Sequence, residues 1–170
     1  GNTLSEGEIS DAMRVIMSGG ANDELIRNFL EALSQRTPAG EELAGACGVM
    51  KEHVNRVDLP DPQSILDTCG TGGAPKTFNV STAAGIVAAA CGVRVAKHGN
   101  KSRTGRGSAE ILKKLGINIE LSAEQQVECL EKVGICFCFA PRHHASVAHA
   151  MPARKSLGRP TIFNLLGPLT

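Results

Sequence analysis

The sequence predicts an α/β protein made of a small N-terminal all-helical domain, residues 1–62, and a mostly parallel α/β sheet domain, residues 63–170. Three observations carry this prediction. Apolar residues recur at helical spacing through residues 3–56. The segment "DLPDPQ", Asp58 to Gln63, is a linker broken by prolines. After it, short apolar runs alternate with helical patterns, which is typical of a parallel sheet with crossover helices.

The first domain is expected to hold three amphipathic helices. Ser5 and Glu8 have the spacing of a capping box, and Asn22 can cap the second helix. Thr37 followed by Pro38 predicts the start of a third helix that continues to about His53. These helices carry no obvious site chemistry, so we expect them to pack against one another and to form a homodimer surface. Their apolar positions are Ile9, Met13, Ile16, Met17, Leu25, Ile26, Phe29, Leu30, Leu33, Leu43, Cys47 and Met50.

The second domain is expected to alternate strands and helices. "SILDTC", "VRVAK" and "ICFCFA" read as strands, and "STAAGIVAAACG" and "GSAEILKKLG" as helices. Ser122 and Gln125 form a second capping box, which opens a helix through "AEQQVECLEKVG". We expect a helix through "HHASVAHAMPARKSLG", interrupted at Pro152. Part of this segment, residues 144–158, can pack back onto the helical domain.

Charge and hydropathy limit the classes of function. The net charge is +1 and the pI about 7.8, which gives no global electrostatic case for nucleic acid or a membrane surface. No stretch reaches the ~20 apolar residues of a membrane span. The N-terminus, "GNTLSEGEISD", is polar and acidic, unlike a secretory signal. We therefore expect a cytoplasmic protein.

The six cysteines are expected to be reduced thiols. Cys136 and Cys138 alternate along a predicted buried strand, which places both thiols on one face of it. A zinc site needs about four ligands, and no CxxC pair accompanies them. The sequence favours buried apolar cysteines over a metal site at this pair.

A glycine-rich turn, "GTGG" at residues 70–73, follows the first predicted strand. Glycines let backbone N–H groups approach an anion, and the helix that follows adds its N-terminal partial charge. Ser81 and Thr82 supply hydroxyls at that helix start. The turn predicts a phosphate site, with a tight strand-to-helix turn capped by Ser81 as the alternative.

A basic loop, "AKHGNKSRTGRGSAE", follows the second predicted strand and therefore lies at the same sheet edge. It holds Lys97, Lys101, Arg103 and Arg106, interleaved with glycines. We interpret it as a cradle for a polyanion, with a solvated surface as the alternative. His98 and Asn100 beside it suit the orientation of a second, uncharged or aromatic substrate.

A third stretch with possible chemistry is "APRHHASVAHAMPARKSLG". Its three histidines, His143, His144 and His149, lack nearby acidic residues, so capping or core roles are favoured over a metal site. Arg154 can offer a planar fork to a carboxylate, with a surface arginine as the alternative.

Taken together, the chain resembles the anthranilate phosphoribosyltransferase family over essentially all of its length. The matching motifs are "GTGG", "TFNVSTAAGIVAAACG", "VAKHGN", "GSAEIL", "FAP" with "HH", and "TIFNLLGPLT". The resemblance implies transfer of phosphoribosyl from phosphoribosyl diphosphate (PRPP) to the amine of anthranilate, with release of diphosphate, in tryptophan biosynthesis. It also implies Mg²⁺ as cofactor and a homodimer.

The resemblance assigns roles to individual residues. Anthranilate contacts are implied for Gly70, His98, Asn100, His144 and Arg154. Ser81 is implied as a Mg²⁺ ligand, and Lys97 as the group that stabilises the departing diphosphate. PRPP contacts are implied for Gly70, Thr71, Gly72, Gly73, Thr77, Asn79, Ser81, Thr82, Lys97, Arg106, Gly107 and Ser108.

Three departures from the family pattern stand out. Ala74-Pro75-Lys76 replaces Asp-Gly after the paired glycines, and the loop from Lys101 to Ser108 is one residue shorter than usual. The chain stops at Thr170, before the Asp-Glu pair that holds Mg²⁺ in the family. We therefore expect an incomplete α/β domain with little or no transferase activity by itself.

Two rival functions remain open at this point. One is a non-catalytic paralogue that binds nucleic acid through the basic loop from Lys101 to Arg106. The near-neutral charge and the intact "KHGN" with Arg154 argue against it. The other is a pyrimidine nucleoside phosphorylase from the wider superfamily.

Overall fold

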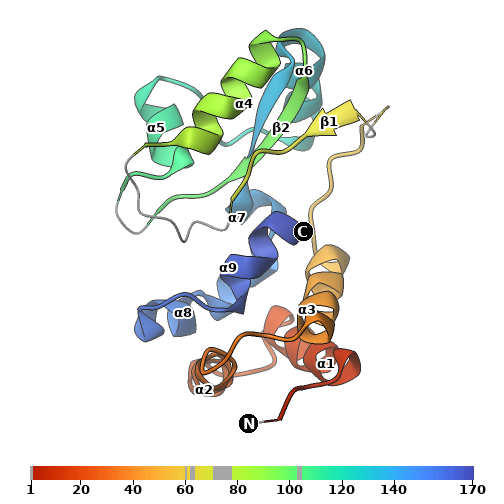
Figure 1. Ribbon diagram of the computed structural model, residues 1–170, viewed down its shortest axis with the longest axis vertical. Helices are drawn as coiled ribbons and strands as arrows, with labels where there is room; N and C mark the ends of the chain where they lie inside the picture. The colour runs from red at the N-terminus through yellow and green to blue at the C-terminus, as the bar shows by residue number, and fades with distance from the viewer. Residues whose placement is uncertain (1, 60, 62–63, 71–77, 103–104) are drawn as a thin grey trace. The chain divides into compact units, whose positions relative to one another are not determined.

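The computed structural model describes residues 2–59, 61, 64–70, 78–102 and 105–170. They fall into two compact units. Figure 1 shows the chain coloured by residue number from red at the N-terminus to blue at the C-terminus. The first unit lies within Gly1–Val54 and His144–Thr170, and the second within Asn55–Gly70 and Ala74–His143. The first unit thus takes in a longer C-terminal stretch than the 144–158 segment expected to pack back on the helices.

The first two helices form where their capping residues predict. Helix α1, Glu6–Met17, begins after Ser5, whose hydroxyl accepts the Glu8 N–H at 3.3 Å while the Glu8 carboxylate accepts the Ser5 N–H at 2.8 Å. Helix α2, Asp23–Leu33, begins after Asn22, whose side chain accepts the Leu25 N–H at 2.9 Å. Both predicted caps are confirmed.

Helix α3, Gly40–Glu52, begins later than the Thr37-Pro38 start expected from sequence, so that prediction is wrong. The physical reason is the Glu42 carboxylate, which accepts the Ala39 N–H at 2.8 Å and so satisfies the start of the helix from within its first turn. The residues before Ala39 therefore remain outside the helix.

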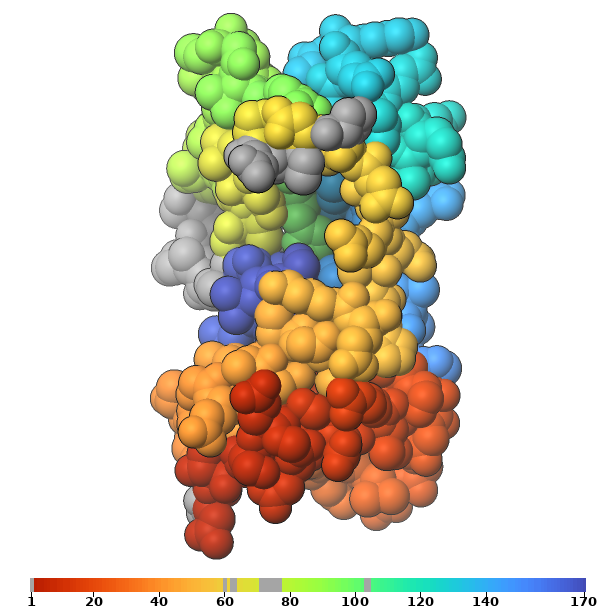
Figure 2. Space-filling view, turned by 90° about the vertical axis from the view of Figure 1, so that its right-hand side faces the viewer, coloured from red at the N-terminus to blue at the C-terminus, as the bar shows by residue number. Residues whose placement is uncertain are grey.

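The C-terminal segment of the first unit packs on these helices. It consists of the 3₁₀ turn η2 (Ala145–Ala150), helix α8 (Met151–Leu157), helix α9 (Ile162–Leu166) and the 3₁₀ turn η3 (Gly167–Leu169). Helix α8 contacts α2, and α9 contacts α3, as Figure 1 shows. In Figure 2 the dark blue end of the chain lies directly against the orange of α3. The shared apolar core includes Ile9, Met13, Leu30, Val49, Ala153, Phe163 and Leu166.

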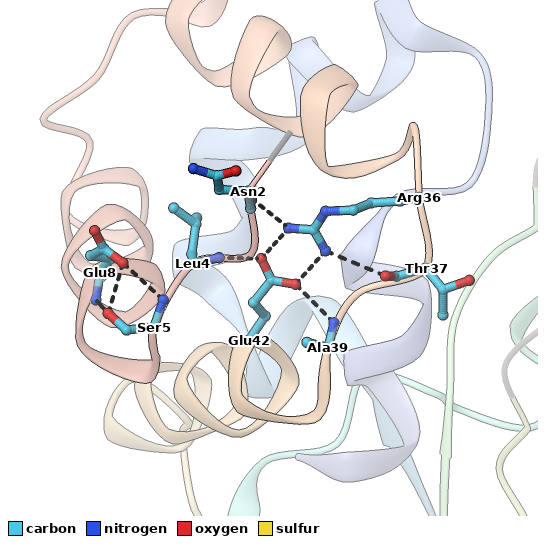
Figure 3. Close-up of polar contacts among 8 residues, drawn as sticks. All are labelled: Asn2, Leu4, Ser5, Glu8, Arg36, Thr37, Ala39 and Glu42. Carbon is cyan, nitrogen blue, oxygen red and sulfur yellow. Dashed lines mark hydrogen bonds and ion pairs between the residues drawn. The ribbon is translucent and has the colours of Figure 1, made fainter.

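A buried ion pair joins the loops of this unit (Figure 3). The Glu42 side chain is fully buried, and both of its oxygens accept hydrogen bonds from the Arg36 guanidinium. The Leu4 N–H donates to the same carboxylate at 3.0 Å, in addition to the Ala39 N–H. These contacts, led by the hydrogen bonds from Arg36, lower the pKa of Glu42 from 4.5 to about 2.

The Glu42 pKa gives an expected acid dependence of stability. Because the folded-state pKa lies below the unfolded value, the unfolded chain takes up this proton first as the pH falls. The contribution of Glu42 to the free energy of unfolding is complete above pH 4.5 and is lost between pH 4.5 and about 2. At pH 7, Glu42→Gln is expected to lower the free energy of unfolding by about 2 kcal/mol, because it removes one partner of a buried charged pair.

Urea unfolding as a function of pH checks this, with Glu41→Gln on the exposed face of the same helix as the matched control. The Glu42→Gln protein should lose less stability than wild type between pH 5 and pH 3. If wild type and Glu42→Gln lose stability in parallel as the pH falls, the Glu42–Arg36 ion pair does not cause the pH dependence of the free energy of unfolding.

The second unit is built on a three-stranded parallel sheet in the order β1-β2-β3. Strand β1 is Ile65–Leu66, β2 is Arg94–Gly99 and β3 is Ile135–Phe139. Leu66 is paired with Val95, and the β2–β3 register runs from Val95 opposite Ile135 to Gly99 opposite Phe139. The parallel α/β class predicted from sequence is confirmed, while the first strand is much shorter than "SILDTC".

Four helices complete the described part of this unit: α4 (Val80–Ala90), α5 (Ser108–Lys114), α6 (Ala123–Val133) and α7 (Ala140–His143). The Ser122–Gln125 capping box is confirmed, and Gly134 ends α6 with a positive φ of 78°. The expected helical stretch over 143–158 is broken into the end of α7, η2 and α8, with Pro152 in the first turn of α8. No helix among the described residues has the length and apolar character needed to cross a bilayer.

Candidate functional site

The candidate site lies at the carboxyl ends of β1 and β2. These strands are parallel neighbours, so the residues that follow Leu66 and those at Lys97–Asn100 lie at one edge of the sheet. The first turn of α4, after Asn79, follows the connection from β1. Thr71, Gly72, Gly73 and Thr77 of the predicted phosphate turn lie outside the described residues, as do Ala74, Pro75, Lys76 and Arg103.

Lys97 is the principal charged group of the site. Its residue surface is only 3% exposed, and its ammonium donates to the Ser81 hydroxyl over 3.2 Å. Burial lowers the pKa of Lys97, and the negative charge of Asp67 opposes this shift. Within the described residues, Ser81 is the one hydrogen-bond partner of this ammonium. A buried cation with so few partners favours an anionic ligand.

Helix α4 holds Ser81 beside this ammonium, and Thr82 follows Ser81 in the first turn of the helix. The Thr68 hydroxyl donates to the Ser81 carbonyl at 2.7 Å, which ties the first turn of α4 to the end of β1. Gly85 lets the helix approach the sheet, since a Cβ there would meet Thr68 Oγ1 at 3.2 Å. The Thr82 hydroxyl is buried and has no hydrogen-bond partner in the part of the chain that the structure describes.

Asp67 holds the ends of the two strands together. Its Oδ1 accepts the N–H of Cys69 at 2.9 Å and the N–H of His98 at 3.1 Å. The Cys69 thiol in turn lies 3.6 Å from His98 Nδ1. Burial is the main cause that lowers the pKa of His98 and raises that of Cys69. Sequence reasoning missed Asp67 and Cys69 as site residues, because both fall inside the predicted strand "SILDTC", whereas the observed strand ends at Leu66.

The second loop, the basic loop that follows β2, depends for its conformation on Glu110 and Gly107. The Glu110 carboxylate accepts the Ser102 N–H at 3.0 Å, and the Ser102 hydroxyl accepts the Arg106 N–H at 2.9 Å. A Cβ on Gly107 would lie 2.8 Å from both the Asn100 carbonyl and the Ser102 nitrogen, so a side chain does not fit. The Arg106 side chain is exposed, and Ser108 is partly buried at the start of α5.

His144 and Arg154 belong to the first unit. The His144 residue is 8% exposed, with Nε2 3.4 Å from the Thr170 hydroxyl. The Arg154 guanidinium lies 5.0 Å from the centre of the Phe163 ring, and burial lowers the pKa of Arg154. The other predicted residues that the structure describes lie in the second unit: Gly70, Asn79, Ser81, Thr82, Lys97, His98, Asn100, Arg106, Gly107 and Ser108.

This arrangement suits a phosphate more than a bare metal ion. An ammonium and two hydroxyls gather at the N-terminus of an eleven-residue helix, where backbone N–H groups and the helix dipole favour an anion. Ser81 is the only one of the expected Mg²⁺ ligands among the described residues, and a lysine ammonium lies 3.2 Å from its hydroxyl. That donor set does not by itself make a magnesium site, which needs several oxygen ligands.

Two family models match the chain. The model described as "Glycosyl transferase family, a/b domain" matches residues 62–170, and "Glycosyl transferase family, helical bundle domain" matches residues 1–54. Among curated proteins, the chain is 50% identical to an anthranilate phosphoribosyltransferase from Methylococcus capsulatus, covering 100% of the chain and 50% of that protein. It is 49% identical to the enzyme of the same name from Acetivibrio thermocellus, with the same coverage.

Solved structures agree with these matches. An anthranilate phosphoribosyltransferase from Thermus thermophilus has a TM-score of 0.87 at 39% identity, covering 99% of this chain and 52% of that one. The Saccharomyces cerevisiae enzyme in complex with PRPP and Mg has a TM-score of 0.83 at 34% identity, covering 97% and 50%. The yeast enzyme has also been solved with 4-fluoroanthranilate. The chain spans about half the length of the curated relatives it matches.

Proposed function

Because the chain belongs to the glycosyl transferase family, through both a helical bundle domain and an α/β domain, we propose that the protein containing it is an anthranilate phosphoribosyltransferase. The reaction transfers phosphoribosyl from PRPP to the anthranilate amine and releases diphosphate. The single observation that supports this most is the buried Lys97 ammonium, held by Ser81 at the start of α4.

Lys97 and the first turn of α4 would bind the diphosphate of PRPP. A buried ammonium interacts with a phosphate more strongly than an exposed one, because less water screens it. Ser81 and Thr82 add hydroxyls, and Gly70 to Gly73, Thr77 and Asn79 are proposed to line the same group from the connection between β1 and α4. Arg106, Gly107 and Ser108 would contact PRPP from the second loop.

For anthranilate, the contacts proposed in the second unit are Gly70, His98 and Asn100, and those proposed in the first unit are His144 and Arg154. Burial favours the neutral form of His98, which suits contact with an uncharged aromatic ring. Arg154 is oriented by Phe163 and presents a guanidinium that fits the anthranilate carboxylate.

The chemistry proposed is direct displacement at the anomeric carbon of the ribose. The aromatic amine attacks with its lone pair, so it needs no prior deprotonation. The new C–N bond forms as the bond to diphosphate breaks, and the extra proton on the nitrogen is then lost to solvent. The chain contributes mainly by positioning the substrates and by stabilising the charge on the leaving group through Lys97. The Ser81 hydroxyl would be the contact on this chain for Mg²⁺, an ion that would supply neutralisation of part of the phosphate charge.

The test is to incubate the protein that contains this chain with PRPP and Mg²⁺ and to measure the loss of anthranilate fluorescence. Anthranilate should be consumed only when PRPP is present, with diphosphate formed in equal amount. Phosphate-dependent cleavage of thymidine or uridine without this activity would favour the nucleoside phosphorylase. Salt-sensitive duplex binding without either activity would favour the nucleic-acid paralogue.

The two arginines are expected to affect different substrates. Arg106→Ala should raise the apparent PRPP constant about tenfold, because it removes a charge-assisted contact, and leave the anthranilate constant nearly unchanged. Arg154→Ala should do the reverse. Steady-state kinetics at low ionic strength, with each substrate varied in turn, measures both effects. If Arg106→Ala leaves the PRPP constant intact, the loop is a solvated surface.

We also propose that the protein is a cytoplasmic homodimer that associates through the helical domain. The supporting observation is the set of amphipathic helices α1–α3, whose residues take no part in the proposed site. Sedimentation at micromolar concentration tests this, and a protein that stays monomeric contradicts it.

A further inference from the structure

Three potential metal ligands of different chemistry meet at the carboxyl edge of the sheet. Asp67, Cys69 and His98 each place a ligand atom within 4.8 Å of the other two. They come from the ends of two neighbouring strands, which are distant in sequence but adjacent in the fold. None of the groups proposed to bind phosphate is among them, and only His98 has a role in the proposed function.

We propose that Asp67, Cys69 and His98 form a binding site for a zinc-like divalent cation. In tetrahedral zinc sites, Zn–S is about 2.3 Å and Zn–N about 2.0–2.1 Å, so neighbouring S and N ligands lie about 3.5 Å apart. The observed distance between Cys69 Sγ and His98 Nδ1 is 3.6 Å. The two atoms therefore already lie at the edge length of such a site.

Asp67 also positions the other two ligands, Cys69 and His98. Asp67 Oδ1 accepts the backbone N–H groups of both Cys69 and His98, so one carboxylate orients the backbone of both other ligands. Hydrogen bonds of this kind around metal ligands restrict their orientation and raise metal affinity. Asp67 is exposed and the other two are partly buried, which leaves a path for the cation from solvent.

The mixed donor set selects the metal. A thiolate and an imidazole favour Zn²⁺ and Co²⁺ over Mg²⁺, which prefers oxygen ligands. On binding, the Cys69 S–H bond breaks, the sulfur lone pair bonds to the cation, and the proton passes to solvent. Three protein ligands leave a fourth coordination position for water, as in zinc sites that exchange a ligand. The nearby Lys97 ammonium repels the cation, so we expect a moderate affinity.

The test is a Co²⁺ titration of the reduced chain, followed by absorbance. Wild type should bind one equivalent with thiolate-to-cobalt charge-transfer absorption and the visible bands of tetrahedral cobalt. Zn²⁺ should displace it in equal amount, and excess Mg²⁺ should not. Cys69→Ser should abolish the charge-transfer band, and His98→Gln should weaken binding by about tenfold or more.

Matched variants separate this site from the other thiols. Cys91→Ser removes an exposed cysteine and should leave the titration unchanged. Cys138→Ser, which alters the partly buried Cys136–Cys138 pair, should also leave it unchanged. Charge-transfer absorption that persists in Cys69→Ser, or that is lost in Cys138→Ser instead, would overturn the proposal.

A second measurement on wild type avoids any folding defect of the variants. Zn²⁺ should protect Cys69 from alkylation, read by peptide mass spectrometry, while Cys91 continues to react. Equal alkylation of Cys69 with and without Zn²⁺ would also overturn the proposal. Neither readout depends on transferase activity, so this proposal and the proposed function can fail independently.

Discussion

Lys97→Met is expected to lower kcat/KM for PRPP by about 10²–10³-fold in the protein that contains this chain, the range seen when one preorganised group that stabilises developing charge is removed. The Lys97 ammonium is almost completely buried and hydrogen-bonded to Ser81 at the start of α4. Methionine retains much of the apolar stem, which packs near Gly85, but removes the charge that would face the diphosphate. The loss should appear in kcat as well as in the PRPP constant, because negative charge develops on the leaving group.

Lys113→Met is the matched control for this loss of charge. Lys113 lies on α5, is half exposed and pairs with Glu120 at 3.4 Å. An exposed pair of this kind contributes at most about 1 kcal/mol, so the kinetics should stay close to wild type. Retention of wild-type kcat/KM in a folded Lys97→Met protein would remove Lys97 from the proposed chemistry.

Gly45→Ala is expected to lower the free energy of unfolding by about 3 kcal/mol, the upper part of the range for overpacking. A Cβ at Gly45 would lie 2.5 Å from the Glu6 carbonyl oxygen and 2.6 Å from Ile9 Cγ2. The nearest atom is backbone, so α1 and α3 must separate before the methyl group fits. That separation loosens the core between the two helices, which includes Ile9 and Met13.

Gly48→Ala, on the same helix, should have the opposite effect. Gly48 is exposed, and a Cβ there has no heavy atom within 4 Å among the described residues. Alanine is more stable than glycine in a helix interior by roughly 0.5–1 kcal/mol. Urea unfolding followed by circular dichroism compares the two variants. Equal stabilities would mean that α1 and α3 do not pack as closely as the structure has them.

Local signals in the sequence predicted the helix starts that depend on neighbouring residues. The capping boxes at Ser5 and Ser122 lie within three residues of their partners, so the sequence shows both halves of each interaction. The start of α3 was misplaced because its decisive group, Glu42, is an acidic residue inside the helix. Its burial by Arg36 and Leu4 depends on how the chain folds back, which no local pattern shows.

For a similar reason, some residues of the candidate site were predicted from the sequence and others were missed. Lys97 and Ser81 were predicted because each belongs to a motif at a strand or helix end. Asp67 and Cys69 were not, because their partner His98 is on another strand and only the register of β1 on β2 brings it near. The first strand was overestimated because Asp67 Oδ1 accepts the Cys69 N–H, which turns the chain away from a longer strand.

The most direct test of the account is a titration of the isotopically labelled chain with PRPP and Mg²⁺, followed by backbone amide chemical shifts. The proposed function requires the diphosphate to bind beside Lys97. The largest shifts should therefore fall on Asn79, Ser81, Thr82, Lys97 and His98, and they should be absent from Lys97→Met. Shifts confined to α1–α3, or a pattern unchanged by Lys97→Met, would contradict a phosphate site at this edge of the sheet.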